Sequence, residues 1–135
     1  MSLTYTSIYV GSDGRSHFRE VELALAERII GPLIPPLGAS AVLPSQACYF
    51  LTFPPGIAMD WHPAPGRLFH CFLAGQCEVT VEDGEVRSFC AGDIVLAEDT
   101  TGRGHLTRNP GPGQALMAVV ALADGAESTP PAPHG

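Results

Sequence analysis

The sequence predicts an all-β protein of one domain, in which short strands close into a barrel or jelly roll. Glycine and proline account for 15 and 13 of the 135 residues, and this density disfavours a helix bundle and predicts short strands joined by turns. The dipeptide Asp83-Gly84 separates two runs of alternating apolar and polar residues, which is a strong hairpin signal. About eight or nine strands can be placed, and a sheet of that many short strands closes on itself.

The N-terminal third contains two predicted strands and one irregular crossing. Residues 4–10 and 18–25 have the character of strands, and the turn residues Gly11-Ser12-Asp13-Gly14 separate them. Residues 31–45 include four prolines, which exclude an interior helix or a central strand. We therefore expect this segment to cross the surface as a long loop.

From residue 46 onward the chain is predicted to be a succession of strands with little helix. These strands cover residues 46–53, 68–73, 77–81, 85–89, 94–97, 105–108 and 114–122. One barrel domain is therefore expected over residues 1–125. Residues 126–135 are rich in proline and offer little to bury, so a disordered tail is predicted there.

The charge balance bounds the possible partners. Seven basic and 14 acidic residues give a net charge of −7, and phosphate backbones would repel such a chain, which argues against nucleic acid. No stretch reaches the roughly 18 apolar residues of a membrane span. The first residues also lack the basic and apolar regions of a secretory signal. We therefore expect a cytoplasmic protein with neither nucleic acid nor membrane as partner.

The four cysteines do not form a metal or redox motif in the sequence. Cys48, Cys71, Cys77 and Cys90 include no pair with C-x-x-C spacing. In a cytosolic chain rich in strands we expect four reduced and mostly buried thiols.

Residues 56–109 carry two motifs that resemble those of the small bacterial cupins. The first cupin motif has the form G-x5-H-x-H-x(3,4)-E-x6-G. Gly56 and Gly75 match its two ends, and His62 matches its first histidine. Ala64 stands at the second histidine position and Leu68 at the glutamate position. Neither of these side chains can bind a metal.

The second cupin motif, G-x5-P-x-G-x2-H-x3-N, is similar to residues 92–109. Gly92 opens it, Glu98 replaces the proline, and the loop that follows is two residues longer than the pattern. His105 and Asn109 then match the final histidine and asparagine. The resemblance implies a small double-stranded β-helix that keeps a histidine at two of the four usual ligand positions, His62 and His105.

A third histidine lies on the strand that carries the glutamate position. Side chains on a strand alternate, so Leu68, His70 and Phe72 share one face, and the resemblance implies that this face points into the barrel. The candidate metal ligands are therefore His62, His105 and His70. The metal would be Zn, Fe, Ni, Cu or Mn, which the sequence does not distinguish. For His70 the alternative is a core histidine without a metal.

Further candidates are expected at the wall or mouth of the cavity. The cavity-lining candidates are Leu68, Phe72, Trp61 and Arg67. Trp61 would pack at the rim or stack on a ligand, and Arg67 would bind a carboxylate or form a salt bridge. Glu98 and Asp99 are candidate acid or base groups, with a solvated turn pair as the alternative.

Two functions follow from these residues. The first is a metal-dependent enzyme, an oxidoreductase, dioxygenase or isomerase, in which His62 and His105 hold the ion and a small organic molecule completes its coordination. An anionic molecule is favoured, because it supplies the oxygen ligand that the missing glutamate would have given. The second is a metal-free module without catalytic activity that binds a small molecule in the same cavity. Leu68 favours the second function because it makes the cavity more apolar.

The resemblance also implies a homodimer. Small cupins commonly pair by exchanging N-terminal strands, and residues 4–10 would suit that role. Pairing would also cover an exposed sheet edge.

Overall fold

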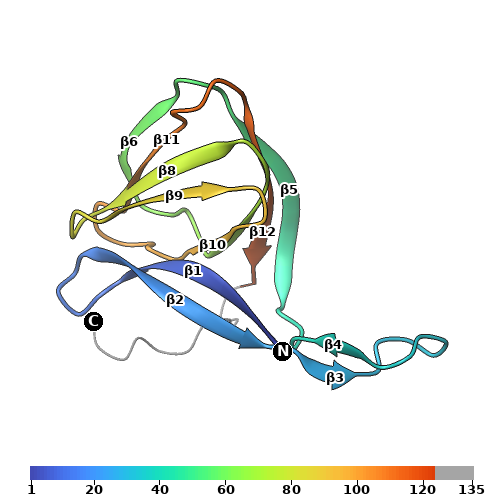
Figure 1. The fold of residues 1–135 in the computed structure, drawn as a ribbon. Helices are drawn as coiled ribbons and strands as arrows, with labels where there is room; N and C mark the ends of the chain where they lie inside the picture. Colours follow the sequence, from blue (N-terminus) through green and yellow to red (C-terminus); the bar gives the residue numbers. More distant parts are fainter. Residues whose placement is uncertain (124–135) are drawn as a thin grey trace.

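The computed structural model describes residues 1–123, and these residues contain strands and no helix (Figure 1). The prediction of an all-β protein is therefore confirmed. None of the described residues forms a helix that could cross a membrane. The expected tail at residues 126–135, and with it the end of the expected domain, lies outside the described residues. The strands are β1 Ser2–Val10, β2 Ser16–Ala24, β3 Ala26–Arg28, β4 Leu37–Ala39, β5 Ser45–Phe53, β6 Ala58–His62, β7 Leu68–Ala74, β8 Gln76–Val81, β9 Val86–Cys90, β10 Ile94–Ala97, β11 His105–Arg108 and β12 Ala115–Leu122.

Two sheets face each other across the main core. The larger sheet has the strand order β2-β1-β10-β7-β12-β5, and the smaller one has the order β6-β11-β8-β9. Phe72 and Met117 of the larger sheet meet Cys77, Val79 and Phe89 of the smaller sheet in one apolar cluster. β8 and β12 give every second side chain to this cluster, as the alternation in the sequence predicts.

The Asp83-Gly84 hairpin is confirmed. It joins β8 to β9, which pair antiparallel with Thr80 opposite Val86. Gly84 has a φ of 94°, a left-handed conformation that glycine adopts without a steric penalty.

The outer face of the larger sheet carries a second apolar cluster. Its buried members are Tyr5, Val21, Phe69, Leu96 and Leu122. They alternate along their strands with the residues that face the main core, so the larger sheet is apolar on both faces. The Tyr5 and Phe69 rings meet edge to face with their centroids 5.1 Å apart, a favourable geometry for aromatic pairs.

The first strand completes the chain's own sheet. β1 pairs antiparallel with β2 and parallel with β10, and both of its edges are therefore occupied. This differs from the expectation of a strand that lies ahead of the barrel and is available for exchange. The homodimer itself stays a prediction.

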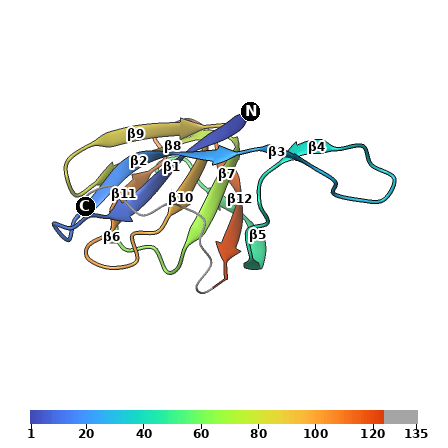
Figure 2. The same cartoon turned by 90° about the horizontal axis from the view of Figure 1, so that it is seen from below.

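Residues 31–45 differ from the long surface loop that was expected. Their central part forms β4, which pairs with β3 in a separate two-stranded sheet. This hairpin projects away from the barrel (Figures 1 and 2). The prolines lie outside the two short strands, which explains how a segment rich in proline still pairs.

β6 was not predicted, and the cysteines are more exposed than expected. β6 has five residues, Ala-Met-Asp-Trp-His, of which Met59 and Trp61 are half-buried while Ala58 and Asp60 are exposed. Its alternation is therefore limited to two apolar positions. All four cysteines are free, as expected, but Cys48 and Cys90 are exposed and Cys77 alone is fully buried. The expectation of mostly buried thiols was wrong because both exposed thiols lie on strands at the edges of their sheets.

Candidate functional site

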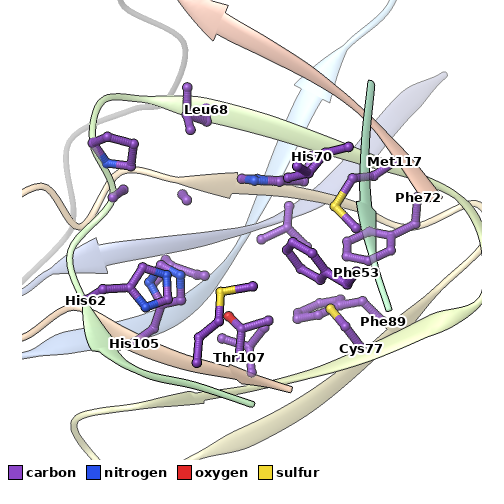
Figure 3. A pocket seen from close by; sticks show the side chains of 18 of the residues that line it. Phe53, His62, Leu68, His70, Phe72, Cys77, Phe89, His105, Thr107 and Met117 are labelled. Carbon is purple, nitrogen blue, oxygen red and sulfur yellow. The ribbon is translucent and has the colours of Figure 1, made fainter. Parts of the chain in front are cut away.

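A cavity of about 310 Å³ lies between the two sheets (Figure 3). Its wall is mostly apolar and is lined from both sheets, with β5 and β7 giving three residues each, and its polar groups are chiefly the side chains of three histidines. The predicted wall residues Leu68 and Phe72 do line it. Such a cavity, apolar with a few polar groups, is typical of small-molecule sites.

Two of the histidines lie together at one end of the cavity. His62 is the last residue of β6 and His105 is the first residue of β11, and the two residues are paired across the sheet. Their ring centroids are 4.6 Å apart, and Figure 3 shows the rings side by side. The sheet register therefore brings together the two histidines that the motifs singled out.

Gly104 makes this close approach possible. Its φ is 78°, and a Cβ built on it would lie 1.9 Å from the carbonyl oxygen of His62. Ser16 Oγ donates a buried hydrogen bond of 2.6 Å to the carbonyl oxygen of Gly104. The residue before His105 is thus held against the backbone of His62 at a distance that excludes any side chain.

His105 is held by a buried carboxylate. Its Nδ1 donates to Oδ2 of Asp99 at 2.6 Å, and Asp99 is fully buried. Since a carboxylate oxygen accepts here, the proton of His105 lies on Nδ1, and Nε2 is directed away from Asp99. Asp99 is therefore a partner of the site, and the alternative of a solvated turn residue was wrong.

His62 is held in the same way by a backbone group. Its Nδ1 lies 2.7 Å from the carbonyl oxygen of Asp60, and a carbonyl can only accept, so Nδ1 carries the proton. Both rings of the histidine pair, His62 and His105, thus leave Nε2 for other contacts. The Asp60 contact could not be predicted from the sequence, because it is made by a backbone carbonyl at the end of β6.

His70 lies in the cavity wall but apart from the histidine pair (Figure 3). It sits in the middle of β7 between Val95 of β10 and Val119 of β12. Burial, followed by the influence of His105, lowers the pKa of His70 from 6.5 to about 4, so this ring is neutral at pH 7. The predicted three-histidine cluster is not formed: residues 1–123 contain no set of three His, Cys, Asp or Glu side chains close enough to hold a metal.

The two predicted rim residues have other partners. The Arg103 guanidinium lies over the Trp61 ring, 4.5 Å from its centroid. Arg67 Nε lies 3.4 Å from Oε1 of Glu98, which is the salt-bridge alternative for this arginine. Neither Trp61 nor Arg67 is among the residues that line the cavity.

Glu98 is part of a structural network outside the cavity. Ser7 Oγ donates to its Oε2 at 2.6 Å, and Arg19 Nη2 lies 3.6 Å from the same oxygen. Ser7 is fully buried, and its hydroxyl needs such an acceptor. Glu98 therefore stabilises the packing of β1 and β2, and the expectation of a solvated turn residue was wrong for it too.

No protein-family model and no curated protein matches the sequence. Several solved structures are similar to it. A Cupin 2 conserved barrel domain protein from Salinispora arenicola is 26% identical, with 57% of this chain and 62% of that chain covered and a TM-score of 0.47. An RmlC-like cupin with a double-stranded β-helix fold from Methanocaldococcus jannaschii is 20% identical, with 60% and 78% covered and a TM-score of 0.48. A predicted oxalate decarboxylase from Thermotoga maritima is 22% identical, with 58% and 68% covered and a TM-score of 0.45.

The fold class rests on the chain's own strand pairing, since these TM-scores are all below 0.5. The match also spans less than two thirds of the Salinispora protein, so activities of whole relatives do not carry over. The chain is an all-β protein, and the solved structures named above include cupins, the family that its motifs resemble.

Proposed function

We propose that this protein binds a small, largely apolar organic molecule in the cavity between its sheets. The observation that carries the proposal is the position of the histidine pair at one end of an otherwise apolar wall. The volume of about 310 Å³ is at the lower end of the range for small-molecule sites. An apolar body would pack against Phe53, Phe72 and Met117, and a polar head would meet the histidines.

The head group is a neutral hydrogen-bond donor such as a hydroxyl. Nδ1 of each ring of the histidine pair already donates to Asp60 or Asp99, so the neutral form of each ring presents Nε2 as an acceptor. Asp99 is fully buried behind His105, and its carboxylate disfavours an anionic head close by. The geometry therefore favours an alcohol or phenol over the anionic ligand expected from the sequence.

Benzyl alcohol and benzoate test this proposal, since they share a ring and differ in the charge of the head. Titration followed by NMR at pH 7 should show benzyl alcohol in the cavity and binding of benzoate that is at least several-fold weaker. His62→Ala should weaken the binding of benzyl alcohol about fivefold or more, since one hydrogen bond contributes about 1 kcal/mol. His17→Ala is the matched control, because His17 is a surface histidine that pairs with Asp13 and Asp83.

Two results would contradict the proposal. One is that benzyl alcohol leaves every cavity resonance unmoved up to its solubility limit, and the other is that it binds equally well to the His62→Ala variant. If benzoate binds more tightly than benzyl alcohol, the cavity is a ligand site but the head group is an anion and not a neutral donor.

A second candidate is a divalent metal, Zn, Fe, Ni, Cu or Mn, held by His62 and His105 alone. The observation that favours it is that Nδ1 of both rings donates a hydrogen bond, to the Asp60 carbonyl in His62 and to the Asp99 carboxylate in His105. Histidines that bind a metal through one ring nitrogen usually donate the other N–H to such an acceptor. Two protein ligands are fewer than the three of typical catalytic zinc sites, so the organic ligand would have to supply further donor atoms. A bound ion would act as a Lewis acid, and the oxidoreductase, dioxygenase or isomerase chemistry expected from the sequence depends on it.

Elemental analysis and melting curves separate the two candidates. A metal site raises the melting temperature as the metal concentration rises, and the rise should disappear in His62→Ala and His105→Ala. A protein that is purified without metal and shows no such rise supports the metal-free module.

We also propose a cytoplasmic setting and no nucleic-acid partner. Four free cysteines, two of them exposed, suit a reducing compartment. The net charge of −7 opposes the approach of a phosphate backbone.

A further inference from the structure

The β3–β4 hairpin and the segment after it form an apolar arm, residues 26–42, that projects from the barrel (Figures 1 and 2). β3 and β4 pair with each other and with no other strand of the described chain. Leu33 is 96% exposed, Val42 90% and Ile29 76%. Burying such side chains is favourable, and the arm of a single protomer leaves them in water.

A second uncovered apolar surface lies at the end of the larger sheet. β5 is the edge strand there and pairs on one side with β12. Phe50 alternates with Leu51, which lines the cavity, so Phe50 points to the outer face, where it is 71% exposed. Leu73 lies on the same outer face and is 50% exposed. We call Phe50, Leu73 and the exposed Cys48 the β5 face.

The arm and the β5 face together have no net charge, in a chain that is acidic. No charged residue stands between Arg28 and Asp60 in the sequence, although the chain carries a net charge of −7. The rest of the surface carries the excess negative charge, which opposes the association of two copies there. A negatively charged lipid surface would attract basic residues, and the arm carries one arginine and one glutamate. The charge pattern therefore fits a second copy of this chain.

The exposed area is large enough for a stable dimer. A fully exposed large apolar side chain presents ~120 Å², so the eight exposed apolar residues of the arm and the β5 face present roughly 600 Å² of apolar side-chain surface. The largest apolar patch on a typical monomer is roughly 300–600 Å². A specific homodimer buries roughly 800 Å² on each partner, of which about 65% is apolar, and this surface can supply that apolar part.

We propose that the arm of each protomer packs on the β5 face of a second copy in a two-fold symmetric dimer. The arm leads directly into β5, so the donor and acceptor surfaces are neighbours on one protomer, and a two-fold axis makes both contacts at once. The uncovered edge of β5 is protected by the same contact. The interface is therefore the arm, and β1 stays within its own sheet.

Sedimentation velocity at tens of micromolar protein tests this dimer. The wild type should sediment at twice the mass of the chain, and Leu33→Asp in the arm or Phe50→Asp on the β5 face should sediment as a monomer. Val86→Asp is the control, because Val86 is an exposed apolar residue, 49%, on β9 of the other sheet. This variant should remain dimeric. Circular dichroism of each variant shows whether the barrel is folded, and Leu33→Ser repeats the arm test without a charge.

Cysteine labelling locates the contact independently of mass. Alkylation of Cys48 should be at least several-fold faster in Leu33→Asp than in the wild type, whereas the exposed Cys90 should react equally in both. A monomeric wild type, or a dimer that survives both Leu33→Asp and Phe50→Asp, would overturn the proposal. Unchanged labelling of Cys48 would place the contact elsewhere, and binding to lipid vesicles by a monomer would assign the arm to a membrane. None of these results depends on what the cavity binds.

Discussion

Gly104→Ala should damage the stability of the protein and its histidine site together. The new Cβ would lie 1.9 Å from the carbonyl oxygen of His62, 2.2 Å from its carbonyl carbon and 2.4 Å from Cα of Pro63. All three are backbone atoms, which cannot move aside as the end of a flexible side chain can. The substitution must therefore push the end of β6 away from β11 and separate His62 from His105.

The cost has two parts. An L-residue at a φ of 78° loses about 1 kcal/mol relative to glycine. Overpacking against a fixed backbone adds roughly 1–3 kcal/mol, and the buried hydrogen bond from Ser16 to Gly104 restrains the backbone movement that would relieve it. We expect a total of about 3 kcal/mol, which lowers the melting temperature by ~10 °C in a domain of this size.

Urea unfolding and NMR titration with benzyl alcohol measure both effects. Gly84→Ala is the matched control, because Gly84 also has a positive φ, 94°, but open space where its Cβ would lie. That variant should lose about 1 kcal/mol and keep its affinity for the alcohol. Equal losses of stability in the two variants, or unchanged binding by Gly104→Ala, would refute the role of Gly104 in setting the histidine pair.

Three other residues give sharp predictions. Because burial lowers the pKa of His70 to about 4, the unfolded chain binds a proton between pH 6.5 and 4 that the folded chain does not. The free energy of unfolding should therefore fall by about 3 kcal/mol as the pH drops through that window. Urea unfolding of the wild type and of His70→Gln measures this fall as a change in the difference between their stabilities. A difference that stays constant with pH would contradict the prediction. Asp99→Ala leaves the buried Nδ1–H of His105 without its acceptor and should cost about 1–3 kcal/mol in the same assay, whereas Asp99→Asn, which can still accept, should cost less. Leu68→Glu places a carboxylate at the glutamate position of the first motif. Added Zn²⁺ or Ni²⁺ should raise the melting temperature of this variant more than that of the wild type. Leu68→Gln, which is of similar size but uncharged, should show a smaller rise.

Much of the strand pattern could be predicted from the sequence. β8 and β9 alternate cleanly because one face of each packs in the main core, and the Asp83-Gly84 turn fixes their register. β6 could not be predicted, because its five residues offer two apolar positions, Met59 and Trp61, which are too few for an alternation to stand out. The hairpin of β3 and β4 was hidden among prolines that lie outside its pairing residues.

The candidate site was predicted in part. The motif spacing singled out His62 and His105, and the register of β6 and β11 brings them together. The alternation of Leu68, His70 and Phe72 also favoured His70, but a side chain directed into the barrel from the middle of β7 need not reach the ends of β6 and β11. Asp99 looked like a loop residue, and its burial beside His105 depends on the path of a loop that is longer than the motif.

The sequence by itself determined the all-β class, the main hairpin and the two histidines, because these depend on local alternation, turn chemistry and motif spacing. The tertiary structure decided which polar side chains meet: Asp99 with His105, Glu98 with Ser7, and His70 among valines. It also decided that the arm stands free of the barrel. Some of these contacts join residues that are far apart in the chain, and their partners depend on strand register. Others depend on the path of a loop, which the local sequence does not determine.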